Sequence, residues 1–198
     1  ARRQRQMCIR DSYVGLCFIC AMREKPGHVN HLEGGNIQFA PFIPTPEGTE
    51  KARELSELFA NAGIKTRAFD AAEQIQWYKL VWNIPFNGLC LALGGISIAE
   101  LYQNPENVMR ARRIMEEVVQ AAKARGYALP EDLVEFHLSR TETMGAFIPS
   151  SAVDYNEGRP VEYTAIWGDP LSKARQAGAS VPEWELLDKA IRKRLNIN

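Results

Sequence analysis

Three polar side chains recur at every fourth position in an otherwise apolar stretch. The segment WYKLVWNIPFNGLCLAL, residues 77–93, contains Lys79, Asn83 and Asn87. On an α-helix this spacing places all three on one face, drifting by about 40° per step. A buried helix that carries a cation and two amides needs a reason, because buried polar groups require partners and buried lysines are rare unless they are paired. The segment therefore predicts a central, buried helix that carries a binding or catalytic site.

A structural role is the alternative for these side chains. Pro85 lies inside the same segment and interrupts the helical hydrogen-bonding pattern. The two amides could cap or cross-link backbone groups around that kink. This alternative accounts for an asparagine more easily than for Lys79, because buried lysines are rare unless they are paired. The functional interpretation is therefore favoured.

A second group of polar residues lies in PSSAVDYNEGRPVE, residues 149–162. Ser150 and Ser151 offer hydroxyl groups, and Glu162 follows a glycine- and proline-containing turn at the predicted start of a helix. Each feature also fits a helix cap or a helix that restarts after a break. Taken alone, this group leaves the choice between a structural and a chemical role open.

The elements around these segments change character near residue 70. Residues 13–42 contain three short β-like runs, separated by predicted turns at 25–27 and 33–35. A helix with one apolar face follows from Thr45 to a glycine stop, and the short strand IKTRAF comes after it. A helix, a glycine stop and a strand in this order are typical of the last α/β unit of a larger layered domain.

Helical periodicity takes over after residue 70. The predicted helices cover residues 77–93, 104–125, 130–144, 160–177 and 182–195, and the last four have a proline near the first turn. The predicted fold class is α+β: the C-terminal part of a Rossmann-type α/β domain over residues 13–70, followed by an all-α substrate and dimerisation domain over residues 71–198.

Composition excludes several classes of protein. Lys and Arg number 24 and Asp and Glu also 24, so the chain lacks the basic excess expected of a nucleic-acid or membrane-surface protein. No apolar stretch reaches the roughly 18 residues that a membrane span requires. Four cysteines are too few for a disulfide scaffold. We expect a soluble cytoplasmic protein without nucleic-acid or membrane partners.

Two apparent metal-binding patterns carry little weight. Cys17 and Cys20 are three residues apart in a predicted strand, which puts the thiols on opposite faces, and no second pair exists. His28 and His31 have the same spacing, and His137 stands alone on a predicted helix. We therefore expect no metal site.

Residues 1–12, ARRQRQMCIRDS, differ from everything that follows and contain four arginines. A signal peptide is disfavoured because charged residues follow the next apolar run without a small-residue cleavage site. Residues 2–12 resemble the in-frame translation of a transposase adapter used in DNA library preparation. We therefore expect residues 1–12 to be an artefactual tail that plays no part in the fold.

Two segments together resemble one known family. KLVWNIPFNGL (residues 79–89) and PSSAVDYNEGRPVEYTAIWG (residues 149–168) are similar to the C-terminal half of ketopantoate reductases, the 2-dehydropantoate 2-reductases. Residues 16–40 resemble the strands that close the nucleotide-binding domain of that family. The combination of Lys-x3-Asn-x3-Asn with Ser-x11-Glu is far more specific than either half. The resemblance also implies a C-terminal domain like that of 6-phosphogluconate dehydrogenase.

This resemblance implies an NADPH-dependent oxidoreductase that reduces a 2-keto acid, with ketopantoate to pantoate, a step of pantothenate and coenzyme A biosynthesis, as the family reaction. It implies that Lys79 is the general acid and that Asn83 and Asn87 hold substrate oxygens. Ser150 matches the substrate-binding serine. Glu162 matches a glutamate near lysine and cofactor, which gives it a catalytic and a cofactor-binding role.

Cofactor binding and substrate choice are the open parts of this interpretation. The sequence contains no G-x-G-x-x-G turn, which a dinucleotide fold needs, so we expect an N-terminally truncated chain that binds NADPH poorly. The family has a further asparagine beyond this helix, and Ser97 is the residue nearest to its position in this sequence. The side chain of the substrate is therefore not determined by the resemblance. The expected partners are a small 2-keto acid and a second copy in a homodimer. The alternatives are a related reductase for another 2-keto acid, or a non-catalytic helical module that binds a small acid or a partner chain.

Overall fold

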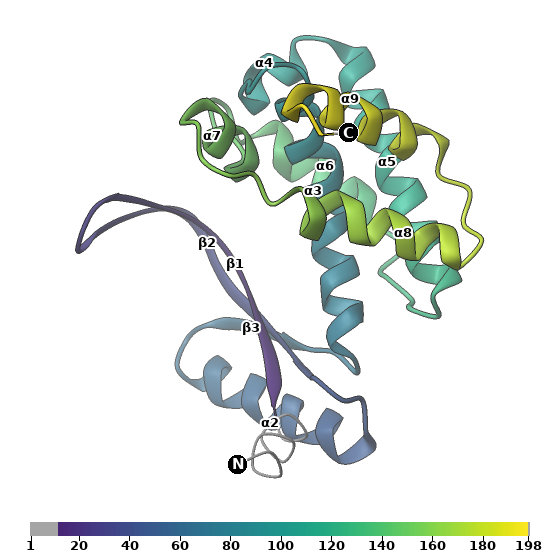
Figure 1. Cartoon of the computed structure of the whole chain (residues 1–198). Helices are drawn as coiled ribbons and strands as arrows, with labels where there is room; N and C mark the ends of the chain where they lie inside the picture. Colours follow the sequence, from purple (N-terminus) through teal and green to yellow (C-terminus); the bar gives the residue numbers. More distant parts are fainter. Residues whose placement is uncertain (1–11, 198) are drawn as a thin grey trace, which may run out of the picture. The chain divides into compact units, whose positions relative to one another are not determined.

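A computed structural model describes residues 12–197, which form two compact units (Figure 1). One unit ends at Gln76 and the other begins at Trp77, so the division falls within helix α3 (Ala72–Ala92). The first unit holds one small sheet and the second is helical, which confirms the predicted α+β fold class. No helix among the described residues is long and apolar enough to cross a membrane.

The sheet has the order β1-β2-β3, with β1 (Tyr13–Lys25) antiparallel to β2 (His28–Pro41) and β3 (Lys65–Ala68) parallel to β2. The hairpin turn at its predicted place contains Gly27 with a φ of 80°.

The predicted second turn at residues 33–35 is wrong, because β2 continues through it. Gly34 pairs with Ile19, and the register shifts between Phe18 and Ile19. Gly34 and Gly35 have φ values of 86° and 114°. A Cβ atom on Gly34 would lie 2.7 Å from the carbonyl oxygen of Phe18. The two glycines therefore form a β-bulge, which lengthens and twists the strand instead of ending it.

Helix α2 (Pro46–Asn61) covers the predicted helix between the strands. Thr45 caps it by accepting the N–H of Gly48 at 3.0 Å, and Pro46 begins its first turn. Ala52 is fully buried, and the ring of Phe59 packs 5.0 Å from that of Phe39 on β2. This apolar contact attaches the helix to the sheet.

The helical unit contains most of α3 and the elements that follow it: α4 (Ile98–Tyr102), α5 (Pro105–Ala124), α6 (Leu133–Glu142), α7 (Ser150–Asn156), the π-helix η1 (Thr164–Gly168), α8 (Asp169–Gln176) and α9 (Pro182–Leu195). Helix α5 begins at its predicted place, after Asn104, whose side chain caps it by accepting the N–H of Glu106. Helix α9 has the predicted bounds, whereas α6 is shorter than predicted at both ends.

The helix predicted over residues 160–177 is divided in the structure. Residues 160–162 are irregular, a π-helical turn follows, and α8 begins at Asp169. Pro170 explains the position of the change, because it has no N–H for the carbonyl of Ile166, four residues earlier. A π-turn inside a helix is rare and is found most often at functional sites.

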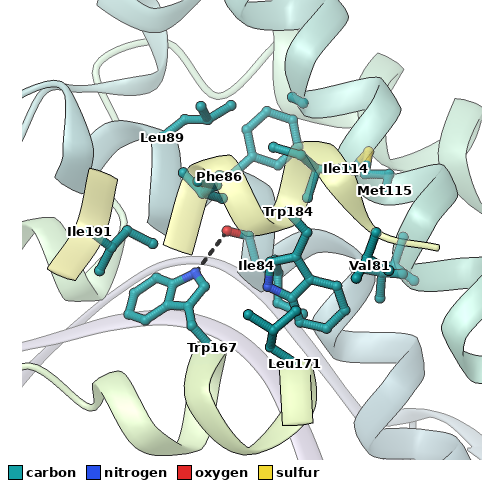
Figure 2. Close-up of a cluster of buried hydrophobic side chains, with 14 of the residues drawn as sticks. Val81, Ile84, Phe86, Leu89, Ile114, Met115, Trp167, Leu171, Trp184 and Ile191 are labelled. Carbon is teal, nitrogen blue, oxygen red and sulfur yellow. Dashed lines mark hydrogen bonds between the residues drawn. The ribbon is translucent and has the colours of Figure 1, made fainter. Parts of the chain in front are cut away.

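Buried side chains from α3, α5, α8 and α9 form one core around Trp167 (Figure 2). The Trp167 side chain is 0% exposed, and its indole Nε1 donates a hydrogen bond of 3.0 Å to the carbonyl oxygen of Ile84 on α3. Gly88 makes this approach feasible, since a Cβ atom there would lie 2.9 Å from that indole nitrogen and 2.7 Å from Cδ2 of Leu187. A mid-helix glycine therefore serves close packing at this point.

Replacing Trp167 by Phe tests the indole hydrogen bond against a matched control. Trp184 is equally buried, but its Nε1 has no hydrogen-bond partner among the described residues. Trp167→Phe and Trp184→Phe remove similar apolar volume, and only the first removes a satisfied donor. We expect Trp167→Phe to lower the free energy of unfolding by about 1–2 kcal/mol more than Trp184→Phe, measured by urea denaturation. Equal losses would contradict a stabilising role for the bond.

Candidate active site

Helix α3 presents the first group of predicted site residues. It runs without a break from Ala72 to Ala92 through Pro85. Lys79 and Asn83 are half-buried, whereas Asn87 is only 2% exposed. The residues between them, among them Val81 and Ile84, belong to the core. The helix therefore holds an ammonium group and two amides along one side of a rigid, packed element.

Asn87 connects this helix to the second group of predicted residues. Its Oδ1 accepts the backbone N–H of Ser151 at 3.1 Å and the hydroxyl of Ser150 at 3.4 Å. Ser151 lies in the first turn of α7, and Pro149 before it offers no capping side chain. Asn87 thus supplies, from another helix, the acceptor that the start of α7 lacks. The structure brings Asn87 and Ser150 together and leaves the Ser150 side chain exposed.

Ser97 has a local structural partner. Its hydroxyl donates to Oε2 of Glu100 at 2.6 Å and accepts the Glu100 N–H at 3.3 Å, which forms a capping box at the start of α4. The hydrogen bonds from Ser97 lower the pKa of the Glu100 carboxyl. The side chain of Ser97, the nearest counterpart of the further family asparagine, is therefore used to cap α4.

Glu162 lies on the irregular segment between α7 and η1, with its side chain exposed. It precedes the helical residues instead of lying inside a first turn, and its carbonyl oxygen accepts the Ile166 N–H at 3.2 Å. Arg159 ties this segment to α7: its backbone N–H donates to the Asp154 carbonyl at 2.8 Å, and its Nε donates to Asp154 Oδ1 at 2.8 Å. The proximity of Glu162 to Lys79 stays a prediction.

Helix α6 contacts α3 through two residues, Tyr78 and Trp82, that come before and after Lys79 in the sequence. Trp82 Nε1 donates to the hydroxyl of Thr141 at 2.8 Å, and the rings of Tyr78 and His137 meet edge-on at 5.9 Å. Burial, with Arg140 nearby, lowers the pKa of His137 from 6.5 to about 4, although a hydrogen bond to the Tyr78 backbone opposes this shift. His137 is therefore neutral at physiological pH and adds no charge near the lysine.

The side chains that the structure describes include no group of three His, Cys, Asp or Glu that could hold a metal ion. Cys90 is fully buried in α3, and burial raises the pKa of its thiol to about 12. A thiol in that environment stays protonated, so Cys90 packs as a small apolar side chain instead of acting as a nucleophile.

One partly buried polar contact next to Glu162 was not predicted from the sequence. The Tyr163 hydroxyl donates a hydrogen bond of 2.7 Å to Oδ1 of Asp188 on α9. Asp188 lies on the helix stripe that also carries Trp184 and Ile191, and it is only 7% exposed. A charged residue on an apolar stripe was the available signal, because such a position requires a polar partner.

Comparison with known proteins identifies the family. Residues 71–194 match the family model described as "Ketopantoate reductase PanE/ApbA C terminal". The chain belongs to the ketopantoate reductase family. It is 33% identical over 172 residues to a 2-dehydropantoate 2-reductase of Nostoc sp., an alignment that covers 85% of this chain and 54% of that protein. The chain therefore spans about half the length of this curated family relative.

Solved structures of the family have the same fold. The crystal structure of 2-dehydropantoate 2-reductase from Geobacter metallireducens matches with a TM-score of 0.82 and 36% identity, over 91% of this chain and 60% of that one. The enzyme from Methylococcus capsulatus matches with a TM-score of 0.77 and 30% identity, over 93% and 58% of the two chains. The predicted family is therefore confirmed.

The capping role of Asn87 can be tested against Ser150. Asn87→Leu removes the acceptor of the buried Ser151 N–H, so we expect the free energy of unfolding to fall by about 1–3 kcal/mol. Ser150→Ala removes only a long hydrogen bond at an exposed site, and the expected change is within about 0.5 kcal/mol. Urea denaturation of both variants measures the difference. Equal effects would refute the assignment of Asn87 as the cap of α7.

His137 should make stability depend on pH. The unfolded chain binds a proton at this histidine near pH 6.5, whereas the folded chain does so only near pH 4. The unfolded state therefore gains protons first as the pH falls, and the fold loses stability through this window. The measured quantity is the difference in unfolding free energy between the wild type and His137→Gln. We expect this difference to fall by up to about 1.4 kcal/mol for each unit by which the pH is lowered from 6.5 to about 4. Urea denaturation at several pH values in this range measures the unfolding free energy of both proteins. Parallel plots of that free energy against pH for the wild type and His137→Gln would contradict the expectation.

Proposed function

We propose that this protein acts in the NADPH-dependent reduction of a 2-keto acid, with ketopantoate as substrate and pantoate as product. The observation that carries the proposal is the family match over residues 71–194, within which Lys79, Asn83 and Asn87 follow one side of the central helix. The hydrogen bond between Ser150 and Asn87 adds a hydroxyl to this group. The proposal concerns the whole protein, and the chain covers about half of its Nostoc relative.

Lys79 has the central chemical role in this proposal. Reduction of a ketone leaves negative charge on its oxygen atom. An ammonium group directed at that oxygen stabilises the charge as it develops and donates the proton that completes the alcohol. Its place on a packed helix fixes the backbone from which the ammonium group reaches the substrate.

The neutral groups orient the substrate. In the proposal, Asn83 and the exposed hydroxyl of Ser150 bind the carboxylate and hydroxyl oxygens of the 2-keto acid. Asn87 uses its Oδ1 for α7, so its amide nitrogen is the group that donates to the substrate. Neutral donors fix the orientation without adding a charge that competes with the ammonium for the ketone oxygen.

The described residues contain no cradle for the pyrophosphate of NADPH. A dinucleotide site needs a glycine-rich turn from a strand into a helix, with free N–H groups at the helix start. The connection from β2 to α2 runs through residues 42–45 without glycine, and Thr45 already accepts the Gly48 N–H. Glu162 retains its predicted place near lysine and cofactor as part of the proposal.

The first experiment is to read the genomic sequence across the Ser12–Tyr13 junction and assay the encoded protein with NADPH and ketopantoate. Loss of NADPH absorbance that depends on ketopantoate supports the proposal. Faster reduction of another 2-keto acid favours a related reductase. Binding of a small acid without any turnover favours a non-catalytic binding module and overturns the proposal. The preference for NADPH over NADH, the homodimer and the cytoplasmic location remain predictions. The same preparation allows the first two to be measured, and the location requires fractionation of cells that express the protein.

Lys79→Ala tests the assignment of the general acid. We expect kcat to fall by about 10²–10⁴-fold, the usual contribution of general acid–base catalysis, while the KM for ketopantoate changes far less. Lys123→Ala on α5 is the control, because that lysine is exposed in the last turn of another helix. Wild-type turnover in Lys79→Ala would remove the lysine from the mechanism.

A further inference from the structure

Tyr163, which directly follows Glu162, is held by three contacts in the helical unit. Its hydroxyl donates to Asp188 Oδ1 at 2.7 Å. Its ring stacks on Trp167, with centroids 6.4 Å apart, and the Arg192 guanidinium lies 5.9 Å above the ring. The contacts come from η1 and from two positions on α9, so the side chain is fixed from more than one direction.

The hydrogen bond to Asp188 is the polar part of this anchor. Asp188 is 7% exposed, and a buried carboxylate requires donors to offset its lost hydration. Burial, together with the bond to Asp188, raises the pKa of the Tyr163 phenol, so Tyr163 remains the donor at neutral pH. A hydrogen bond from a neutral hydroxyl to a carboxylate is stronger than one between neutral groups.

Glu162 depends on its neighbours for its position. Its side chain is exposed, and the backbone there is irregular, with the Tyr163 N–H bonded to the Val161 carbonyl at 2.8 Å. The Glu162 carbonyl then accepts the Ile166 N–H as the π-helical turn begins. An exposed side chain adds no packing that would fix this backbone. The position of Glu162 therefore depends on the residues that flank it, Arg159, which is bonded to Asp154, and the anchored Tyr163.

The contacts of Tyr163 also connect the backbone at Glu162 to the central helix α3. Trp167, on which the Tyr163 ring stacks, donates its indole N–H to the carbonyl of Ile84. Ile84 follows Asn83 directly on α3. A continuous series of contacts therefore leads from the backbone at Glu162 to the helix that carries the lysine and the two amides.

We propose that Tyr163 and Asp188 are positioning residues that fix the backbone at Glu162 relative to α3 for the reduction. This inference rests on the proposed function, because it gives Glu162 a role beside Lys79. Neither Tyr163 nor Asp188 needs to touch the substrate. Their effect is to hold a carboxylate on an irregular segment at one place, as efficient catalysis requires of each participating group.

Hydrogen exchange tests the structural half of this proposal. The Ile166 amide reports on the turn at Glu162, and in Tyr163→Phe we expect it to exchange about tenfold faster or more as local opening becomes easier. Tyr102→Phe is the matched control, because it also deletes one tyrosine hydroxyl bond, that to the Leu138 carbonyl at 3.0 Å. The control should leave exchange at Ile166 unchanged. Unchanged exchange at Ile166 in Tyr163→Phe overturns the proposal.

Kinetics test the functional half, with the protein used for the ketopantoate assay. We expect Tyr163→Phe to lower kcat about tenfold while the KM for ketopantoate changes by less than about threefold, whereas Tyr102→Phe changes neither.

The two Asp188 variants separate the hydrogen bond from the packing. Asp188→Asn keeps an oxygen acceptor for the phenol and should retain most of kcat, whereas Asp188→Leu removes the acceptor and should lose it. Equal loss of kcat in both tyrosine variants would show a general loss of stability and overturn the proposal. If the wild type does not reduce ketopantoate, the proposed function itself is overturned. The exchange measurement does not depend on activity, so it separates that failure from a failure of the positioning role.

Discussion

The helical unit depends on one hydrogen bond at the backbone of its central helix. The indole N–H of Trp167 donates to the carbonyl of Ile84 (Figure 2). Gly88 leaves room for the ring against α3. Leu187 and Ile191 of α9 close over the same glycine. The contact therefore sets the position of the C-terminal elements on α3. A larger residue at position 88 would displace two helices at once, because packed interiors have little free volume.

The candidate site shows how one side chain can serve both stability and chemistry. Asn87 was predicted as a substrate-binding amide, with a structural alternative, and its oxygen caps the first turn of α7. This does not exclude a role for its amide nitrogen, because the two ends of an amide have opposite hydrogen-bonding character. The cap also fixes where Ser150 lies, so the fold and the site share one interaction.

The sequence predicted the helices well because their signals are local. A cap and a first-turn proline mark the start of α5, and the apolar segment around Lys79 marks α3. Two features depended on contacts distant in sequence and were missed: Gly34 forms a bulge because of its partner strand, and Asp188 has a partner 25 residues away. The π-turn was missed although its cause is local, because Pro170 removes a donor within the predicted helix. The spacing of Lys79, Asn83 and Asn87 predicts a shared face, but not which backbone groups these side chains meet.

The segment that carries Glu162 is secured on both flanks, by Arg159 to Asp154 and by Tyr163 to Asp188. Such a segment differs from a mobile lid, which must lose conformational entropy each time a ligand arrives. Here the chain meets that entropic cost once, when it folds. A ligand that reaches this segment encounters backbone that is already ordered, so its affinity need not be reduced by the ordering of a loop.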